Sequence, residues 1–65
     1  MPLGDNVREE RKKQGLTQEQ VARKADVTLN TLFKIEKNRL NPSFLIVDKI
    51  AKALNISMDS LRDNE

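Results

Sequence analysis

The sequence predicts an all-α fold, a compact bundle of five short helices. Signals that start a helix recur along the 65 residues, and the segments between them place apolar residues on one helix face. The chain has no Cys and no His and only two aromatic residues, so small helices packed through Leu, Ile, Val and Ala must supply the core. A chain of this length forms one domain at most. We expect helices over approximately 4–14, 18–25, 29–37, 44–54 and 58–62.

The first helix is expected to start at residue 4 or 5, with Asp5 as its N-cap, and to end before Gly15. Gly15 suits the left-handed position that follows a helix. Val7 lies on the inner face, and Arg11 follows it one turn later on the same face. An Arg on an inner face requires a partner, and the inner edge of the third helix offers Glu36. We therefore predict a structural ion pair between Arg11 and Glu36, at least partly buried, with two independent surface charges as the alternative.

The second and third helices each begin with a capping residue, and a short turn joins them. Thr17 suits the first N-cap, and Gln20 stands three residues later, where a capping box needs its second side chain. Thr28 is the corresponding N-cap of the third helix. Asp26 stands in the turn, where the chain needs a left-handed conformation that Asp tolerates better than most residues. A turn of this length joins two helices at a steep angle, which is the form of a helix-turn-helix.

The third helix has an inward and an outward face. The inward face carries Leu32, Ile35 and, at its edge, Glu36. The outward face carries Leu29, Asn30, Phe33, Lys34 and Lys37. Outward residues of these types suit base edges, because Asn offers a donor and an acceptor to adenine, Lys donates to guanine or phosphate, and Leu covers a thymine methyl.

The fourth and fifth helices are expected to begin at similar caps. Asn38 ends the third helix in a left-handed conformation, Ser43 caps the fourth helix and Ser57 caps the fifth. The core face of the fourth helix is expected to hold Phe44, Val47, Ile50, Ala51 and Leu54. Leu45 and Ile46 lie off this stripe, and two interpretations stand. Either they are exposed and mark a contact surface, or the stripe is wide at this point.

Charge is distributed unevenly along the chain. The net charge is only +2 and the pI is near 9.2, so the arrangement is more informative than the sum. Three cations cluster around the third helix: Lys34, Lys37 and Arg39. The end of the chain carries Asp59, Asp63 and Glu65 against a single Arg62. A basic side and an acidic far end indicate an oriented approach to a polyanion, with a solvated charged surface as the alternative.

The residue types that the sequence lacks disfavour several functions. Without Cys or His there is no disulfide, no usual zinc site, no thiol nucleophile and no imidazole base. The sequence contains no metal-ligand cluster and no phosphate-binding loop, so we expect no enzyme activity, metal, cofactor or small-molecule ligand. There is also no long apolar run and no signal-peptide pattern, so we expect no membrane partner and a cytoplasmic location.

Several motifs follow one another in an order and spacing that one family shares. They are Gly15-Leu16-Thr17-Gln18-Glu19, Val27-Thr28, Ile35-Glu36, Asn41-Pro42-Ser43 and Ile50-Ala51-Lys52-Ala53-Leu54. With these motifs the chain resembles the phage repressor and Cro-type helix-turn-helix proteins of the XRE family. The resemblance implies a lambda-repressor-like bundle in which the second and third helices form the DNA-reading unit. It also implies a homodimer on a near-palindromic operator of double-stranded DNA, with the third helix in the major groove.

The resemblance further implies roles for individual residues. The base-reading positions fall on Leu29, Asn30 and Lys34. Contacts to the DNA backbone, or bracing of the reading helix, fall on Gln18, Thr28, Thr31, Lys37 and Arg39. Phe33 is unusual on a face toward DNA: it could contact thymine methyls or sugar, shield the edge of the helix, or fold back onto the turn. The family commonly has Gly at the positions of Asp26, Asn38 and Asn55.

The leading hypothesis is sequence-specific binding of double-stranded DNA by a homodimeric transcriptional regulator. A repressor is favoured over an activator because the sequence holds no segment beyond the DNA-binding domain. Leu45 and Ile46 are the candidate dimer surface. The alternative is a protein-interaction module, antitoxin-like or an adaptor, that uses Leu45, Ile46 and Phe33 on the same scaffold. The basic cluster around the third helix favours DNA.

Overall fold

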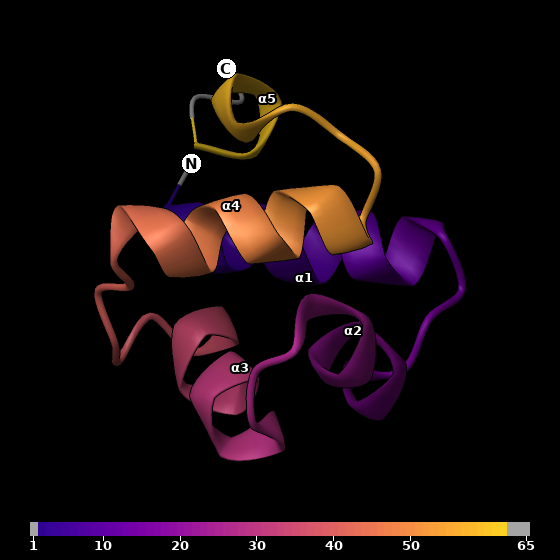
Figure 1. The fold of residues 1–65 in the computed structure, drawn as a ribbon, viewed down its shortest axis with the longest axis horizontal. Helices are drawn as coiled ribbons and strands as arrows, with labels where there is room; N and C mark the ends of the chain where they lie inside the picture. The colour runs from indigo at the N-terminus through magenta and orange to yellow at the C-terminus, as the bar shows by residue number, and fades with distance from the viewer. Residues whose placement is uncertain (1, 63–65) are drawn as a thin grey trace.

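The computed structural model describes residues 2–62 and contains five helices in that range (Figure 1). They are α1 (Leu3–Lys13), α2 (Gln18–Ala25), α3 (Leu29–Glu36), α4 (Phe44–Ala53) and α5 (Met58–Arg62). The expected all-α fold is confirmed, and each helix begins and ends within one residue of its expected bounds. No helix in the described range is long and apolar enough to cross a membrane. Asp63 and Glu65, two of the acidic residues at the chain end, lie outside the described residues.

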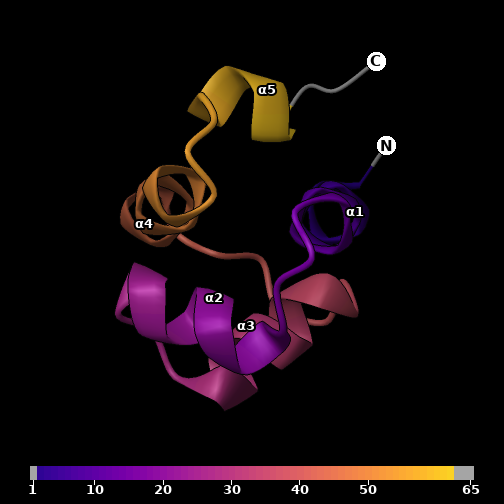
Figure 2. The same ribbon diagram turned by 90° about the vertical axis from the view of Figure 1, so that its right-hand side faces the viewer.

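The helices pack in three levels (Figure 2). The axes of α1 and α4 are nearly parallel: both helices are seen lengthwise in Figure 1 and end-on in Figure 2. Helix α5 lies on one side of them, and α2 and α3 lie on the other. The packed pairs are α2 with α4, α1 with α3, α2 with α3, and α5 with both α1 and α4. The helix-turn-helix therefore occupies the side of the molecule opposite α5.

The core is aliphatic and every helix contributes to it. Its buried members are Val7, Val21, Ala22, Ala25, Leu32, Ile35, Val47, Ile50, Ala51, Leu54 and Leu61. Phe44, expected in the core, is 70% exposed, so that expectation was wrong. Phe44 is the first residue of α4, and a helical side chain leans toward the N-terminus, which carries this ring past the end of the core. Each of the two interpretations of Leu45 and Ile46 holds for one residue. Leu45 is 60% exposed, as expected for a contact surface, whereas Ile46 packs against the core, as expected for a wide stripe.

The expected caps place the starts of α2, α3 and α4. The Thr17 hydroxyl accepts a hydrogen bond from the Gln20 N–H at 3.1 Å, and the Gln20 side chain accepts from the Thr17 N–H at 2.8 Å, which completes the capping box. Thr28 accepts from the Thr31 N–H at 3.0 Å, and Ser43 caps α4 in the same way. The positions expected to be left-handed have positive φ: Gly15 (70°), Asp26 (57°) and Asn38 (59°).

The start of α1 differs from expectation, because its cap comes from a distant residue. The helix begins at Leu3, and Asp5 does not cap it. The Gly4 N–H instead donates to Asn38 Oδ1 at 3.0 Å, and Asn38 Nδ2 donates to the Asp5 carboxylate at 3.0 Å. A Cβ on Gly4 would collide with the Ile35 carbonyl oxygen, so α1 and α3 approach each other as closely as backbones allow. This close approach brings Asn38 to the start of α1, and the sequence around α1 gives no sign of this contact.

A buried ion pair fixes α3 against α1. Arg11 Nε donates to Glu36 Oε2 at 2.8 Å and Arg11 Nη2 donates to Glu36 Oε1 at 3.0 Å. The side chain of Glu36 is 2% exposed and that of Arg11 is 12% exposed. Arg11 Nη1 also donates to the Leu16 carbonyl, and Gln18 Nε2 donates to Glu36 Oε1 at 3.1 Å. The alternative of two independent surface charges is therefore wrong, and a single carboxylate joins α1, α2 and α3.

Replacing Arg11 by Ala should lower the free energy of unfolding by about 3 to 5 kcal/mol, because the Glu36 charge would stay buried without its main partner. Chemical denaturation followed by the helical circular dichroism signal measures this loss. Arg23, exposed on α2, gives a matched control, and Arg23→Ala should change the same quantity by less than about 0.5 kcal/mol. An Arg11→Ala protein as stable as its parent would contradict a structural role for the pair.

Candidate nucleic-acid interface

The outer face of α3 presents side chains of the types that contact DNA. Leu29 is 44% exposed and Phe33 is 39% exposed. Asn30 and Lys34 are exposed beside them, whereas Leu32 and Ile35 are buried in the core. The structure thus brings the three expected base readers, Leu29, Asn30 and Lys34, onto one outward face. The helix that carries this face lies on the side of the molecule away from α5 (Figure 1).

Positive charge dominates this face because the one acid of α3 is buried. Glu36 is 1% exposed and is paired with Arg11. The exposed charges on α3 and the turn after it are all cationic, from Lys34, Lys37 and Arg39. A concentration of one sign of charge raises the local potential and attracts a polyanion.

Phe33 and Lys37 interact on the outer face. The Lys37 ammonium lies 5.7 Å from the centroid of the Phe33 ring, within the range of a cation–π interaction. Phe33 as a whole is 39% exposed, so it remains part of the outward face. The interaction therefore holds an apolar ring and a cation next to each other at the surface.

Three of the residues expected to contact the DNA backbone or brace the helix make contacts within the protein. The Gln18 carboxamide donates to Glu36 Oε1, across the junction of α2 and α3. Thr28 donates from its hydroxyl to the Thr31 hydroxyl at 2.8 Å while it caps α3. The first contact ties the end of α3 to α2, and the second stabilises the first turn of α3. Lys37 and Arg39, the other two residues of this group, are exposed.

Sequence reasoning missed the contacts by which Arg8 and Asn38 join the end of α3 to α1. Arg8 Nη1 donates to the backbone carbonyl of Glu36 at 3.0 Å, and Arg8 Nη2 donates to Asp5 at 3.2 Å. Asn38 joins α1 through its contacts with Gly4 and Asp5. The Arg8 side chain is 41% exposed and resembles an ordinary surface cation. The one available signal for its role was therefore its position one turn before Arg11.

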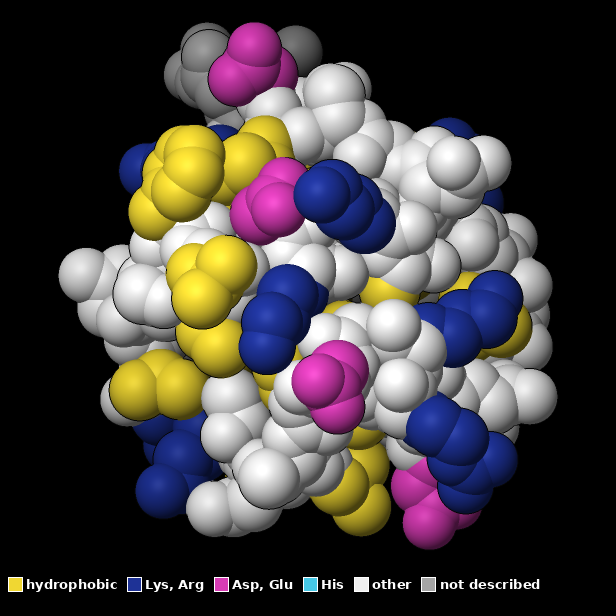
Figure 3. Space-filling model, in the orientation of Figure 1, with side chains coloured by type: hydrophobic (Ala, Val, Ile, Leu, Met, Phe, Trp, Pro, Cys, Tyr) yellow, Lys and Arg dark blue, Asp and Glu magenta, His cyan; other side chains and the backbone are white. Residues whose placement is uncertain are grey.

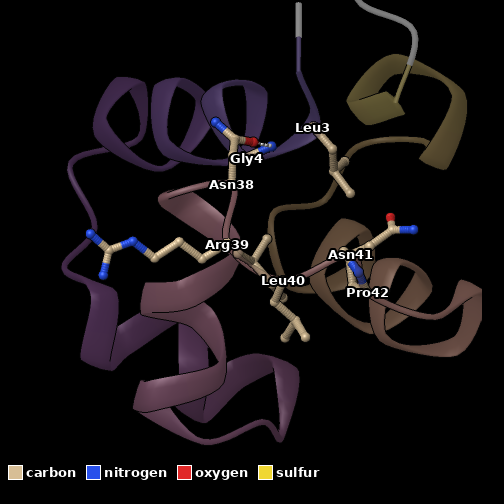
Figure 4. A pocket seen from close by; sticks show the side chains of 8 residues that line it. Leu3, Gly4, Asn38, Arg39, Leu40, Asn41 and Pro42 are labelled. Carbon is tan, nitrogen blue, oxygen red and sulfur yellow. Dashed lines mark hydrogen bonds between the residues drawn. The ribbon is translucent and has the colours of Figure 1, made fainter.

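A hollow of about 320 Å³ lies between the start of α1 and the loop from α3 to α4 (Figure 4). It is lined by Leu3, Gly4, Ile35, Asn38, Arg39, Leu40, Asn41 and Pro42. The Arg39 side chain extends away from Leu40 and Pro42 (Figure 4), so apolar groups and amides make up most of the wall of the hollow. Among the described residues, no group of three or more acidic, His or Cys side chains could hold a metal ion.

Comparison with known proteins gives a family match over most of the chain. A family model described as Helix-turn-helix matches residues 7–61. The chain is 46% identical over 48 residues to an uncharacterized HTH-type transcriptional regulator of Methanothermobacter thermautotrophicus, a match covering 74% of this chain and 70% of that protein. It is 35% identical to the immunity repressor protein of Bacillus phage phi105, a match covering 100% of this chain and 45% of that protein.

A solved structure with the same fold was determined in complex with DNA. It is the crystal structure of SinR, the master regulator for biofilm formation, a protein of Bacillus subtilis. The two chains are 32% identical and superpose with a TM-score of 0.86, over 91% of this chain and 95% of that one.

Proposed function

Because the chain belongs to the helix-turn-helix family of DNA-binding transcription regulators, we propose that it binds a specific double-stranded operator with α3 in the major groove. The observation that carries this proposal is the outer face of α3. Side chains of types that suit base edges are exposed there beside cations, and the one carboxylate of the helix is buried in the core. A carboxylate facing the groove would repel phosphate, so its burial favours a polyanionic partner.

Specificity and affinity come from different residues. We assign base reading to Asn30 and Lys34, which offer hydrogen bonds to purine edges, and to Leu29, which offers an apolar contact. We assign phosphate contacts to Lys37 and Arg39, which are exposed at the end of α3 and in the turn that follows it.

The start of α2 supplies further phosphate contacts. The Gln18 carboxamide is engaged with Glu36, so the phosphate contact at the start of α2 falls to its first backbone N–H groups, where the helix dipole favours an anion. Thr28 and Thr31 brace the start of α3 through their mutual hydrogen bonds.

We propose that two copies of the chain bind one near-palindromic operator and repress transcription. The assignment as a repressor is supported by the likeness to the phage phi105 immunity repressor.

The proposed dimer surface is the start of α4, where Leu45 and Phe44 are the two most exposed large apolar side chains in the described range. Hydrophobic side chains gather over this end of α4 on the face shown in Figure 3. Ile46, the other residue expected in this surface, contributes at its edge because it is partly buried.

Replacing Asn30 by Ala should relax the preference at one base pair by roughly 1 to 3 kcal/mol, because one bidentate contact is lost. Replacing Arg39 by Ala should instead weaken binding to every sequence alike and reduce the salt slope by about 1. The measurement is fluorescence anisotropy on a duplex selected from a random pool, and on variants of it, at several salt concentrations. Arg62→Ala on α5 is the control and should change neither quantity. Equal effects of the Asn30 and Arg39 substitutions would contradict this division.

Replacing Leu45 by Glu should weaken binding to a full inverted repeat by about 100-fold or more, because the gain from linking two half-sites is lost. Binding to a single half-site should stay as in the parent, which serves as the control for folding and for the DNA-binding face. Sedimentation of the DNA complex gives the number of protein chains bound. If Leu45→Glu still binds the inverted repeat as two chains with the parent's affinity, the proposed dimer surface is wrong.

A further inference from the structure

Two large apolar side chains form a strip along the outer face of α3. Leu29 and Phe33 are one helical turn apart, so they are neighbours on that face. They are 44% and 39% exposed, respectively. Asn30 and Lys34 form a second row with the same spacing beside them. We refer to Leu29 and Phe33 together as the apolar strip.

Lys37 marks the end of the apolar strip with a positive charge. It follows Phe33 by one further turn, and its ammonium lies 5.7 Å from the centroid of the Phe33 ring. A surface that covers the strip must therefore be apolar beside Leu29 and Phe33 but anionic next to Lys37. It must also offer hydrogen-bonding groups to the row of Asn30 and Lys34.

The major groove of DNA meets these requirements together. The C5 methyl of thymine is the apolar group on the edges of the base pairs, and donors and acceptors of neighbouring bases surround it. Phosphates border the groove and suit the charge of Lys37 and Lys34. An apolar protein partner would leave the exposed cations beside the strip without opposite charges.

We propose that the apolar strip reads thymine methyl groups, so that the operator half-site carries thymines where Leu29 and Phe33 meet it. This inference rests on the proposed function and names part of its DNA sequence. Residues one turn apart rise by about 6 Å along a helix. Base pairs follow one another every ~3.4 Å. The strip therefore covers thymines one or two base-pair steps apart.

The test replaces thymine by deoxyuridine in the selected duplex, one position at a time and then in pairs. This change removes the C5 methyl and leaves every hydrogen-bonding group in place. Parent affinity should fall about fourfold for each methyl under the strip, and about 15-fold for two, as expected for burial of one methyl each. At thymines outside the strip the affinity should stay within twofold of the parent value.

Protein variants show whether the strip itself detects the methyl. Phe33→Ala should bind the thymine duplex more weakly and should lose its sensitivity to deoxyuridine at one position, and Leu29→Ala should do so at another. Lys34→Ala is the control, since it should bind more weakly yet keep the full sensitivity at both positions. Circular dichroism confirms that each variant is folded.

Two results would overturn the inference in different ways. If the parent discriminates operator from random DNA but is insensitive to deoxyuridine at every position, the strip does not read methyl groups, and the proposed function stands. The same conclusion follows if Phe33→Ala and Leu29→Ala keep the full sensitivity, because the methyl would then act through the shape of the DNA. If the parent shows no preference for any duplex, both the inference and the proposed function are wrong.

Discussion

The carboxylate of Glu36 is the interaction on which the rest of the structure depends. It accepts two hydrogen bonds from Arg11 and one from Gln18, so α1, α2 and α3 meet at one buried group. The backbone carbonyl of the same residue accepts from Arg8. A buried carboxylate without these partners would cost several kcal/mol, so alternative positions of α3 that separate them are disfavoured. In a domain this small, such a constraint replaces the larger core that would otherwise orient the helix.

The same carboxylate also shapes the electrostatics of the proposed interface. Its burial leaves Lys34 and Lys37 as the exposed charges of the helix and of the residue that follows it. The contact that holds α3 in position therefore also leaves only positive charges on its outer face. Structure and proposed binding share one cause, so a substitution at Glu36 would disturb both. Substitutions on the outer face should disturb binding alone.

Features set by local sequence could be predicted, whereas features set by distant neighbours mostly could not. The exception is the Arg11–Glu36 pair, which could be predicted because an Arg on an inner helix face requires an acidic partner. The caps at Thr17 and Thr28 depend on residues three positions away, and the left-handed conformation of Asp26 depends on its own backbone, so each followed from the sequence. The inner and outer faces of α3 followed from helical periodicity in the same way. The exposure of Phe44 and the capping of α1 by Asn38 did not, because they depend on where α1, α3 and α4 meet.

The proposal that α3 reads DNA is tested most directly by an NMR titration of the isotope-labelled chain with the selected duplex, read at each backbone amide. We expect the largest shifts on the outer face of α3, on the start of α2 and on Arg39. Smaller shifts should mark the start of α4, where a second copy makes contact, and amides of α5, on the side opposite α2 and α3, should not shift (Figure 2). Large shifts confined to α5 or to the start of α4, with α3 unchanged, would contradict the claim that α3 is the DNA-reading helix.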